Sequence, residues 1–559
     1  MTGVAVDSTK KIFFRCVFAL VCTMLPPIVA GQQASQSPAT GETVLRVNTR
    51  LVLVDAVVLD KTGKPITNLT ENDFTVLEDG KPQKIAAFSV TVHQPIQANA
   101  GPPILQPHVT TNRPEAMQME GAVAVLLLDG LNTPREDQMY VRQQVLKFLA
   151  NHFDTSYKIA VVALTNKVDM LQDFTSDPKL LKAALDHYVP QMPLLAHNGI
   201  GSPGISLNPQ AAAMIRHTDE KDEEFKRDLR VPVTLAALQN IARYMSGQHG
   251  RKVLLWFSAG FPISVGGGRG GENVESREYH DPRMMVESRD YTDQIWRTTN
   301  LLNEAHVAIY SIDARGLSTG GLSTDGASDP KEIFERLSTE DTLERTAVDT
   351  GGQYFHARND IDLAISLSLQ ESGSYYMLGY YPLEKKWDGK FRQIRVSVDH
   401  AGLQVRHRRG YFAVDSQNWR NGGHDKDLSA ALAPGTLPST EVLFMARALP
   451  PAGNADVNVE FMVDPATILF QGAEGGQYSN LNFEVQAFTP KGKLVKAEVQ
   501  KAEGSLLPKT FERVQKQGLS MQVPIKLPVG RYNLRLGVRD NLTGLFGTAE
   551  LPIEVGTNP

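Results

Sequence analysis

One serine stands where a hydrolase could carry its nucleophile. Residues 253–257 form an apolar run typical of a buried strand, and Ser258 follows it directly, two residues before Gly260. Many hydrolases hold this serine on a strand-to-helix turn with the pattern Gly-x-Ser-x-Gly, and a histidine and an acid complete the triad. Here Trp256 replaces the first glycine, Pro262 follows where the helix should begin, and no histidine and aspartate are placed to complete a triad. We therefore expect that the protein is not an enzyme. A serine hydrolase remains an alternative.

The cysteine and histidine residues exclude two further kinds of chemistry. The only two cysteines, Cys16 and Cys22, fall in an N-terminal leader. A mature chain without them has neither a thiolate nucleophile nor a thiolate metal ligand. The histidines at positions 306, 356, 400 and 407 lack the spacing of a zinc site and are interpreted as surface or structural residues.

The N-terminus has the layout of a secretory signal peptide over residues 1–30. Lys10 and Arg15 belong to a positive region, an apolar stretch covers residues 17–25, and Ala30 is followed by Gly31. The apolar stretch is shorter than the about 20 residues of a membrane-spanning helix. We expect a secreted, periplasmic or cell-envelope protein with no stable membrane span after cleavage, and a retained anchor is the alternative.

Composition indicates a globular protein of several domains. The chain has 559 residues, of which 42% are hydrophobic and 21% charged. Domains are commonly 100–150 residues long, so roughly three or four are expected. The net charge of -5 argues against binding to nucleic acid, which requires a basic face.

Strands alternate with helical patterns between residues 120 and 375. An apolar run at residues 123–128 ends in Asp129, and a later one at 307–312 ends in Asp313. Such alternation predicts an α/β domain with a doubly wound, mainly parallel sheet. Residues 168–174 are predicted to form an antiparallel edge strand.

All-β segments flank this domain on both sides. We expect a small β domain at residues 42–95, a β extension of the α/β domain at 376–415, and an immunoglobulin-like β-sandwich at 436–557. A short basic run, Arg406 to Arg409, ends one of the strands. It is interpreted as a solvated strand end, and a patch for an anionic partner is the alternative.

The chain resembles the bacterial proteins with a von Willebrand factor A-type (VWA) related domain over roughly residues 42–415. The α/β domain is therefore expected to be VWA-like, or Rossmann-like in the broader sense. The stretches that carry the resemblance follow one another along the sequence: Asn68 to Thr70, Glu78 to Pro82, Val125 to Thr133, Arg251 to Pro262, Ser311 to Gly316, Tyr375 to Tyr380, and Arg408 to Tyr411.

The resemblance implies a magnesium site that this chain keeps only in part. VWA domains hold Mg²⁺ with Asp-x-Ser-x-Ser after the first strand, a threonine from a second loop and an aspartate after a later strand. Asp129 and Thr133 match that pattern, Asn132 could add a carbonyl oxygen, and Thr234 could be the second-loop threonine. Thr133 and Glu136 also fit a helix capping box, which explains them without a metal.

The second carboxylate of the family pattern is missing, because Ser258 and Ala259 follow the strand where threonine and aspartate are expected. Mg²⁺ gives up its water reluctantly and is usually held by one or two carboxylates, so we expect an affinity for Mg²⁺ no tighter than about millimolar unless a partner supplies the missing carboxylate. The favoured interpretation is a metal-free binding surface that includes Ser258 and Asp313.

These features favour an exported adhesion or binding module that contacts a protein partner through the carboxyl end of its sheet. An envelope structural or assembly component without a ligand site is the alternative.

Export gives the first testable prediction. N-terminal sequencing of the protein recovered from cells should find a chain that begins near Gly31, because the small residues there suit signal cleavage. A cytoplasmic chain that still begins at Met1 would contradict it.

Overall fold

The computed structural model describes residues 51–92, 106–116, 121–190, 209–260, 264–265, 289–316, 330–384, 386–414, 425–449, 456–473 and 475–556. The expected signal peptide lies outside these residues. The chain divides into Met1–Asn48 and Thr49–Pro559, and everything below concerns the second unit.

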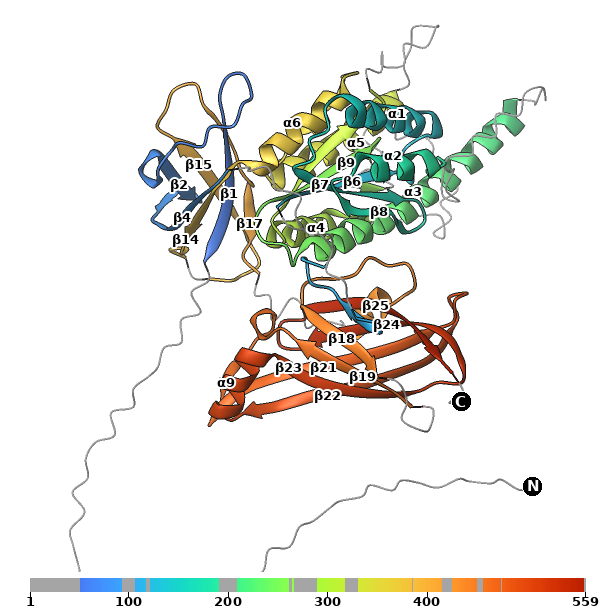
Figure 1. The fold of residues 1–559 in the computed structure, drawn as a ribbon. Helices are drawn as coiled ribbons and strands as arrows, with labels where there is room; N and C mark the ends of the chain where they lie inside the picture. The colour runs from blue at the N-terminus through green and yellow to red at the C-terminus, as the bar shows by residue number, and fades with distance from the viewer. Residues whose placement is uncertain are drawn as a thin grey trace, which may run out of the picture. The chain divides into compact units, whose positions relative to one another are not determined.

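A six-stranded mixed sheet forms the centre of the α/β unit (Figure 1). Its order is β13-β12-β9-β6-β7-β8, and all neighbours pair in parallel except β7 and β8. The strands are β6 (Ala122–Asp129), β7 (Tyr157–Leu164), β8 (Val168–Thr175), β9 (Lys252–Ser258), β12 (Val307–Asp313) and β13 (Tyr354–Phe355). Counted along the chain, this is the doubly wound order 3-2-1-4-5-6, so the predicted mainly parallel sheet and its antiparallel edge strand are confirmed.

Helices cover both faces of this sheet, which explains why its strands are apolar on both sides. One face packs on α1 (Arg135–Asn151), α2 (Pro178–His187) and α6 (Ile361–Gly373). The other packs on α3 (Pro209–Met245), α4 (Thr292–Glu304) and α5 (Pro330–Asp349). Among the described residues, no helix is both long and apolar enough to cross a membrane.

A β unit combines strands from before and after the α/β segment. Its two sheets have the orders β16-β1-β14-β4 and β17-β15-β2-β3 and share one buried cluster. The strands are β1 (Val52–Leu59), β2 (Phe74–Glu78), β3 (Lys81–Gln83), β4 (Ile85–Thr91), β14 (Tyr375–Tyr380), β15 (Phe391–Val398), β16 (Gln404–Arg406) and β17 (Gly410–Phe412). Residues 376–415 were predicted to extend the α/β domain, but the backbone hydrogen bonds of their strands go to β1, β2 and β4.

A buried glutamate fixes the two halves of the β unit to each other. Glu78 is 3% exposed, and its Oε2 accepts hydrogen bonds from the hydroxyls of Tyr380 at 2.6 Å and Tyr411 at 3.0 Å. A buried carboxylate is tolerated only when such donors replace water. These two hydrogen bonds therefore explain why a glutamate can be buried at the end of β2.

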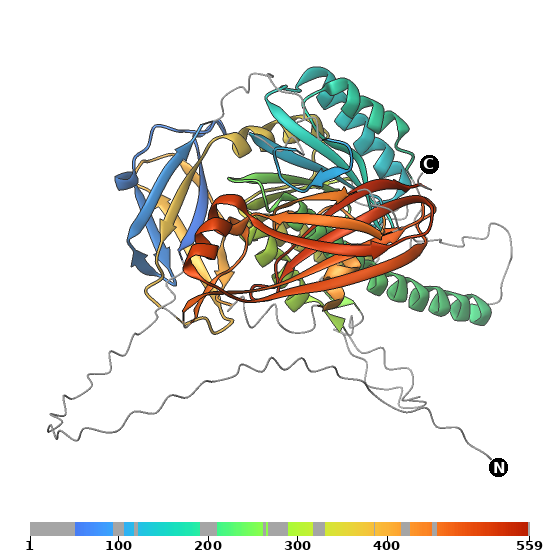
Figure 2. The same cartoon turned by 60° about the horizontal axis from the view of Figure 1, so that its bottom comes forward.

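Two further sheets enclose the last large cluster of buried side chains (Figure 2). One has the order β23-β19-β18-β5, and the other has the order β20-β21-β24-β25, with β22 on β21. The strands are β5 (Val109–Thr111), β18 (Phe444–Leu449), β19 (Asp456–Val463), β20 (Gln471–Ala473), β21 (Gly476–Phe488), β22 (Leu494–Leu506), β23 (Leu519–Lys526), β24 (Gly530–Asp540) and β25 (Phe546–Val555). Because β5 pairs with β18, the predicted segment 436–557 omits one strand of this unit.

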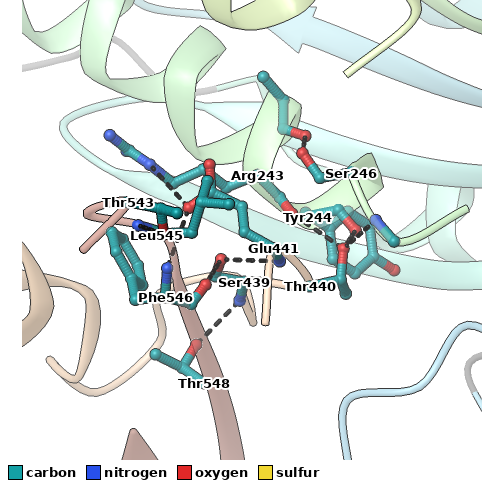
Figure 3. A network of polar contacts seen from close by, with 12 residues as sticks. Arg243, Tyr244, Ser246, Ser439, Thr440, Glu441, Thr543, Leu545, Phe546 and Thr548 are labelled. Carbon is teal, nitrogen blue, oxygen red and sulfur yellow. Dashed lines mark hydrogen bonds and ion pairs between the residues drawn. The ribbon is translucent and has the colours of Figure 1, made fainter. Parts of the chain in front are cut away.

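Thr440 and its neighbours connect the C-terminal sheets to the end of α3 (Figure 3). The Thr440 hydroxyl accepts a hydrogen bond from the Gly247 backbone N–H at 2.7 Å and lies 3.0 Å from both the Arg243 and Tyr244 carbonyl oxygens. A Cβ at position 247 would lie 2.9 Å from the Thr440 Cβ, so the close approach requires glycine. This contact fixes the end of a helix that also reaches the carboxyl end of the α/β sheet.

A proline interrupts the hydrogen bonding of α3 on the way. Pro232 has no N–H to donate to the Asp228 carbonyl one turn earlier. The Tyr291 hydroxyl lies 3.2 Å from that carbonyl oxygen and makes a shorter contact with the Asp228 carboxylate, so its one proton is shared between the two acceptors. The helix therefore continues through the proline.

Thr440→Val should lower the free energy of unfolding by about 1–3 kcal/mol, because the Gly247 N–H loses its acceptor while the side chain at position 440 keeps nearly the same shape. Urea unfolding measures the loss. Thr110→Val is the matched control, since the exposed Thr110 hydroxyl bonds only the Glu550 carbonyl at 2.9 Å. Equal losses in the two variants would show that the Thr440 contact has no special role.

Candidate site at the carboxyl end of the sheet

Three polar residues end neighbouring parallel strands of the α/β sheet. Asp129 ends β6, Ser258 ends β9 and Asp313 ends β12. Leu128 lies opposite Phe257, and Asp313 lies opposite Ser258, so the three strand ends are adjacent. The strand order reverses between β6 and β9, and open α/β sheets bind ligands at this switch point.

Asp129 is the centre of a closed polar network. Its Oδ1 accepts hydrogen bonds from the Asn132 backbone N–H at 3.0 Å and the Asn132 amide at 3.1 Å. Its Oδ2 accepts from the Asn132 amide at 2.9 Å, the Trp256 indole N–H at 3.0 Å and the Ser258 hydroxyl at 2.7 Å. Both oxygens of the carboxylate are therefore occupied by donors of the protein itself.

The groups that hold Asp129 are all uncharged. Burial raises the pKa of its carboxyl, and the hydrogen bonds from Asn132, Ser258 and Trp256 offset this only in part, so the pKa remains above its usual value. A buried carboxylate without a cation depends on hydrogen-bond donors for its stability. The loop after β6 and the end of β9 are therefore both hydrogen-bonded to the same carboxylate.

The network extends to α3 and to the turn after β9. The Asn132 amide donates to the Thr234 hydroxyl at 2.8 Å, and this hydroxyl donates to the Arg230 carbonyl at 3.0 Å. The Thr133 hydroxyl accepts from the Ala259 N–H at 3.2 Å. The structure therefore brings together the four residues that the resemblance suggested as metal ligands.

The expected capping box at Thr133 is wrong. Helix α1 begins at Arg135 with Pro134 at the N-cap, and no side chain caps it. The Thr133 hydroxyl faces the turn after β9 instead, because the Ala259 N–H needs an acceptor there.

The residues around Asp129 do not fit Mg²⁺. The ion requires several oxygen lone pairs in octahedral arrangement. Both Asp129 oxygens and the Thr234 hydroxyl already take part in hydrogen bonds, and the indole N–H of Trp256 can only donate. In the described part of the chain, no three His, Cys, Asp or Glu side chains are grouped so as to hold a metal.

Asp313 takes no part in this network. Arg315 donates to both of its oxygens, at 2.9 Å from Nε and 2.8 Å from Nη2, and also approaches Glu340 at 3.3 Å. Asp313 is therefore committed to a local ion pair and does not supply the missing second carboxylate.

Ser258 and Asp313 were predicted on a binding surface, but both are buried. Ser258 is 0% exposed and Asp313 6%. Ser258 donates to Asp129 and accepts from the Gly260 N–H at 2.9 Å, and among the described residues these hydrogen bonds of its hydroxyl involve no histidine. Beside this network the exposed residues are Pro134, Arg135 and Glu136, at the start of α1.

Trp256 is the member of the Asp129 network that sequence reasoning missed. It was considered only as a departure from a nucleophile turn, although it lies two residues before Ser258 and therefore on the same face of β9. That spacing of two residues was the signal in the sequence, because an Asp129 side chain that reaches Ser258 lies on the same face of the sheet as Trp256.

The order of the six strands decides the fold. The α/β unit has the doubly wound, mainly parallel sheet of open α/β domains. No protein-family model and no curated protein matches the chain.

Similar solved structures include three bacterial proteins. An aerotolerance-related membrane protein from Bacteroides fragilis is 13% identical, with 45% of this chain and 100% of that chain covered and a TM-score of 0.25. The vWF domain of a type V pili tip protein from Porphyromonas gingivalis is 13% identical, with 44% and 92% covered and a TM-score of 0.25. The pilus adhesin SpaC from Lactobacillus rhamnosus GG is 8% identical, with 88% and 58% covered and a TM-score of 0.26. At these scores the strand order, rather than the superposition, supports the fold.

Asp129→Ala should lower the free energy of unfolding by about 2–4 kcal/mol, because the buried Ser258, Trp256 and Asn132 donors lose their acceptor.

The melting temperature of the unmodified protein should not change with millimolar Mg²⁺. The matched control is Asp137→Ala, since burial raises the pKa of the half-buried Asp137 and removal of its charge should cost little. A Mg²⁺-dependent rise that disappears in Asp129→Ala would show a working metal site.

Proposed function

We propose that this chain is an exported, VWA-like binding module that contacts a protein partner at the carboxyl end of its α/β sheet without a metal. The observation that supports the proposal is the closed hydrogen-bond network around Asp129. It lies at the switch point, where open α/β sheets bind ligands, and it holds the surrounding loops in place.

Three features favour recognition over catalysis. The one serine at the strand end donates to a carboxylate whose other partners are an amide and an indole. A serine nucleophile needs a histidine to take its proton, and none belongs to this network. The exposed start of α1 next to the network carries Arg135 and Glu136, which suit contacts with a protein surface.

The flanking β units are proposed to act as spacers or docking surfaces. The C-terminal unit is proposed to be immunoglobulin-like, since two antiparallel sheets enclose its core. Thr440 joins this unit to α3, and Thr234 joins α3 to the network. A contact at the carboxyl end of the sheet would therefore be mechanically connected to the C-terminal unit.

Site-directed crosslinking tests the proposal. A cysteine at Glu136, in the first turn of α1, carries a photo-crosslinker at the carboxyl end of the sheet. The matched control is a cysteine at the exposed Thr155, which precedes β7 at the opposite end. After illumination with an envelope extract in EDTA, we expect a discrete adduct from position 136 and none from position 155.

Equal adducts from both positions, or none from either, would contradict a partner at the carboxyl end and favour an envelope structural component. An adduct that requires Mg²⁺ would contradict the metal-free part of the proposal alone.

A further inference from the structure

Two arginines meet at the opposite, amino end of the α/β sheet. Arg251 directly precedes β9 and is 5% exposed, and Arg408 lies between β16 and β17 of the β unit. The Arg251 Nη2 donates to the Gly351 carbonyl at 2.7 Å, and the Arg408 Nη2 donates to the Leu53 carbonyl at 2.7 Å. Neither guanidinium forms an ion pair with a carboxylate of the described residues.

The nearby carboxylates have other partners. Asp55 Oδ2 lies 2.8 Å from His306 Nδ1, and Glu371 pairs with Arg406 and accepts from the Tyr310 hydroxyl at 2.8 Å. Burial alone would raise the pKa of Asp55, but His306 and the two arginines hold it below its usual value. Asp55 therefore acts on both guanidinium groups, and Glu371 also acts on Arg251 and Glu304 on Arg408.

A small cavity lies among these groups. Its volume is about 10 Å³, which is room for one particle of about the size of water. Its polar lining consists of Asp55, Arg251, Asn303, His306, Thr350 and Arg408. The Nε atoms of both arginines are shielded from solvent and have no hydrogen-bond partner, and burial lowers the pKa of Arg408.

We propose that this cavity binds one small monovalent anion, of the chloride type, that accepts hydrogen bonds from the Nε–H groups of Arg251 and Arg408. A buried charge is costly unless a counter-charge is present, and a halide supplies both the charge and the acceptor. The unpartnered Oδ1 of Asp55 would favour a water molecule instead. Two unpartnered N–H donors, the Nε–H groups of Arg251 and Arg408, stand against this single unpartnered acceptor, which favours the anion.

The anion would join two parts of the chain. Asp55 and Arg408 belong to the β unit, whereas Arg251 and His306 belong to the α/β unit. An ion bound between them contributes to their packing only in the folded state. The stability of the protein should therefore depend on halide concentration.

Thermal melts in sodium chloride, sodium bromide and sodium gluconate test the proposal at an ionic strength of about 150 mM. We expect the melting temperature to be about 2–4 °C higher in both halides than in gluconate. If the salts acted only through general protein hydration, the melting temperature should be lowest in the weakly hydrated bromide. A melting temperature that is equal in the three salts, or lowest in bromide, would overturn the proposal.

Arg408→Gln should remove the halide dependence, because it deletes one of the two charges. The matched control is Arg409→Gln, whose side chain is 53% exposed and lies 3.5 Å from Asp349; it should keep the dependence. If Arg408→Gln does not fold, crystals of the unmodified protein grown in bromide decide the question. An anomalous peak between the two Nε atoms is expected, and a water molecule without anomalous signal there would overturn the proposal.

Discussion

The buried carboxylate of Asp129 determines how the carboxyl end of the α/β sheet is built. Five hydrogen bonds, two to Oδ1 and three to Oδ2, reach it from the loop after β6 and from β9. Each donor would otherwise be buried without a partner, so the loop, the strand end and α3 can take few other positions. All of these donors are uncharged, and they offset the effect of burial on the pKa of this carboxyl only in part.

Local sequence patterns predicted part of this site. Asp129 and Ser258 end apolar runs, and parallel strands bring such ends together, so their proximity could be expected. Asp313 ends a third run, yet Arg315, two residues later, takes both of its oxygens. Burial of Ser258 and the contact with Trp256 could not be predicted, because they depend on which side chains fill the space above the strand ends.

The fold was predictable where its interactions are local. Alternating strands and helices predicted the doubly wound sheet, but β14, β15, β16 and β5 each pair with a strand that lies hundreds of residues away in sequence. Period-two patterns identify a strand without naming its neighbour. The run Arg406–Arg409 was interpreted as solvated because its sequence does not show what packs against it. In the structure, the Arg408 Nε is buried, and the cavity beside it is lined by residues from β1 and from the segment before β9.

The composite β unit makes the α/β unit an insertion. Strand β1 pairs with β14 and β16, and β2 pairs with β15, so the chain leaves the β unit after β4 and returns to it at β14. A tensile force applied at residues 51 and 414 would load the hydrogen bonds between these strands. The α/β sheet would stay outside the load path until they separate, and its surface would keep its shape on a chain under tension.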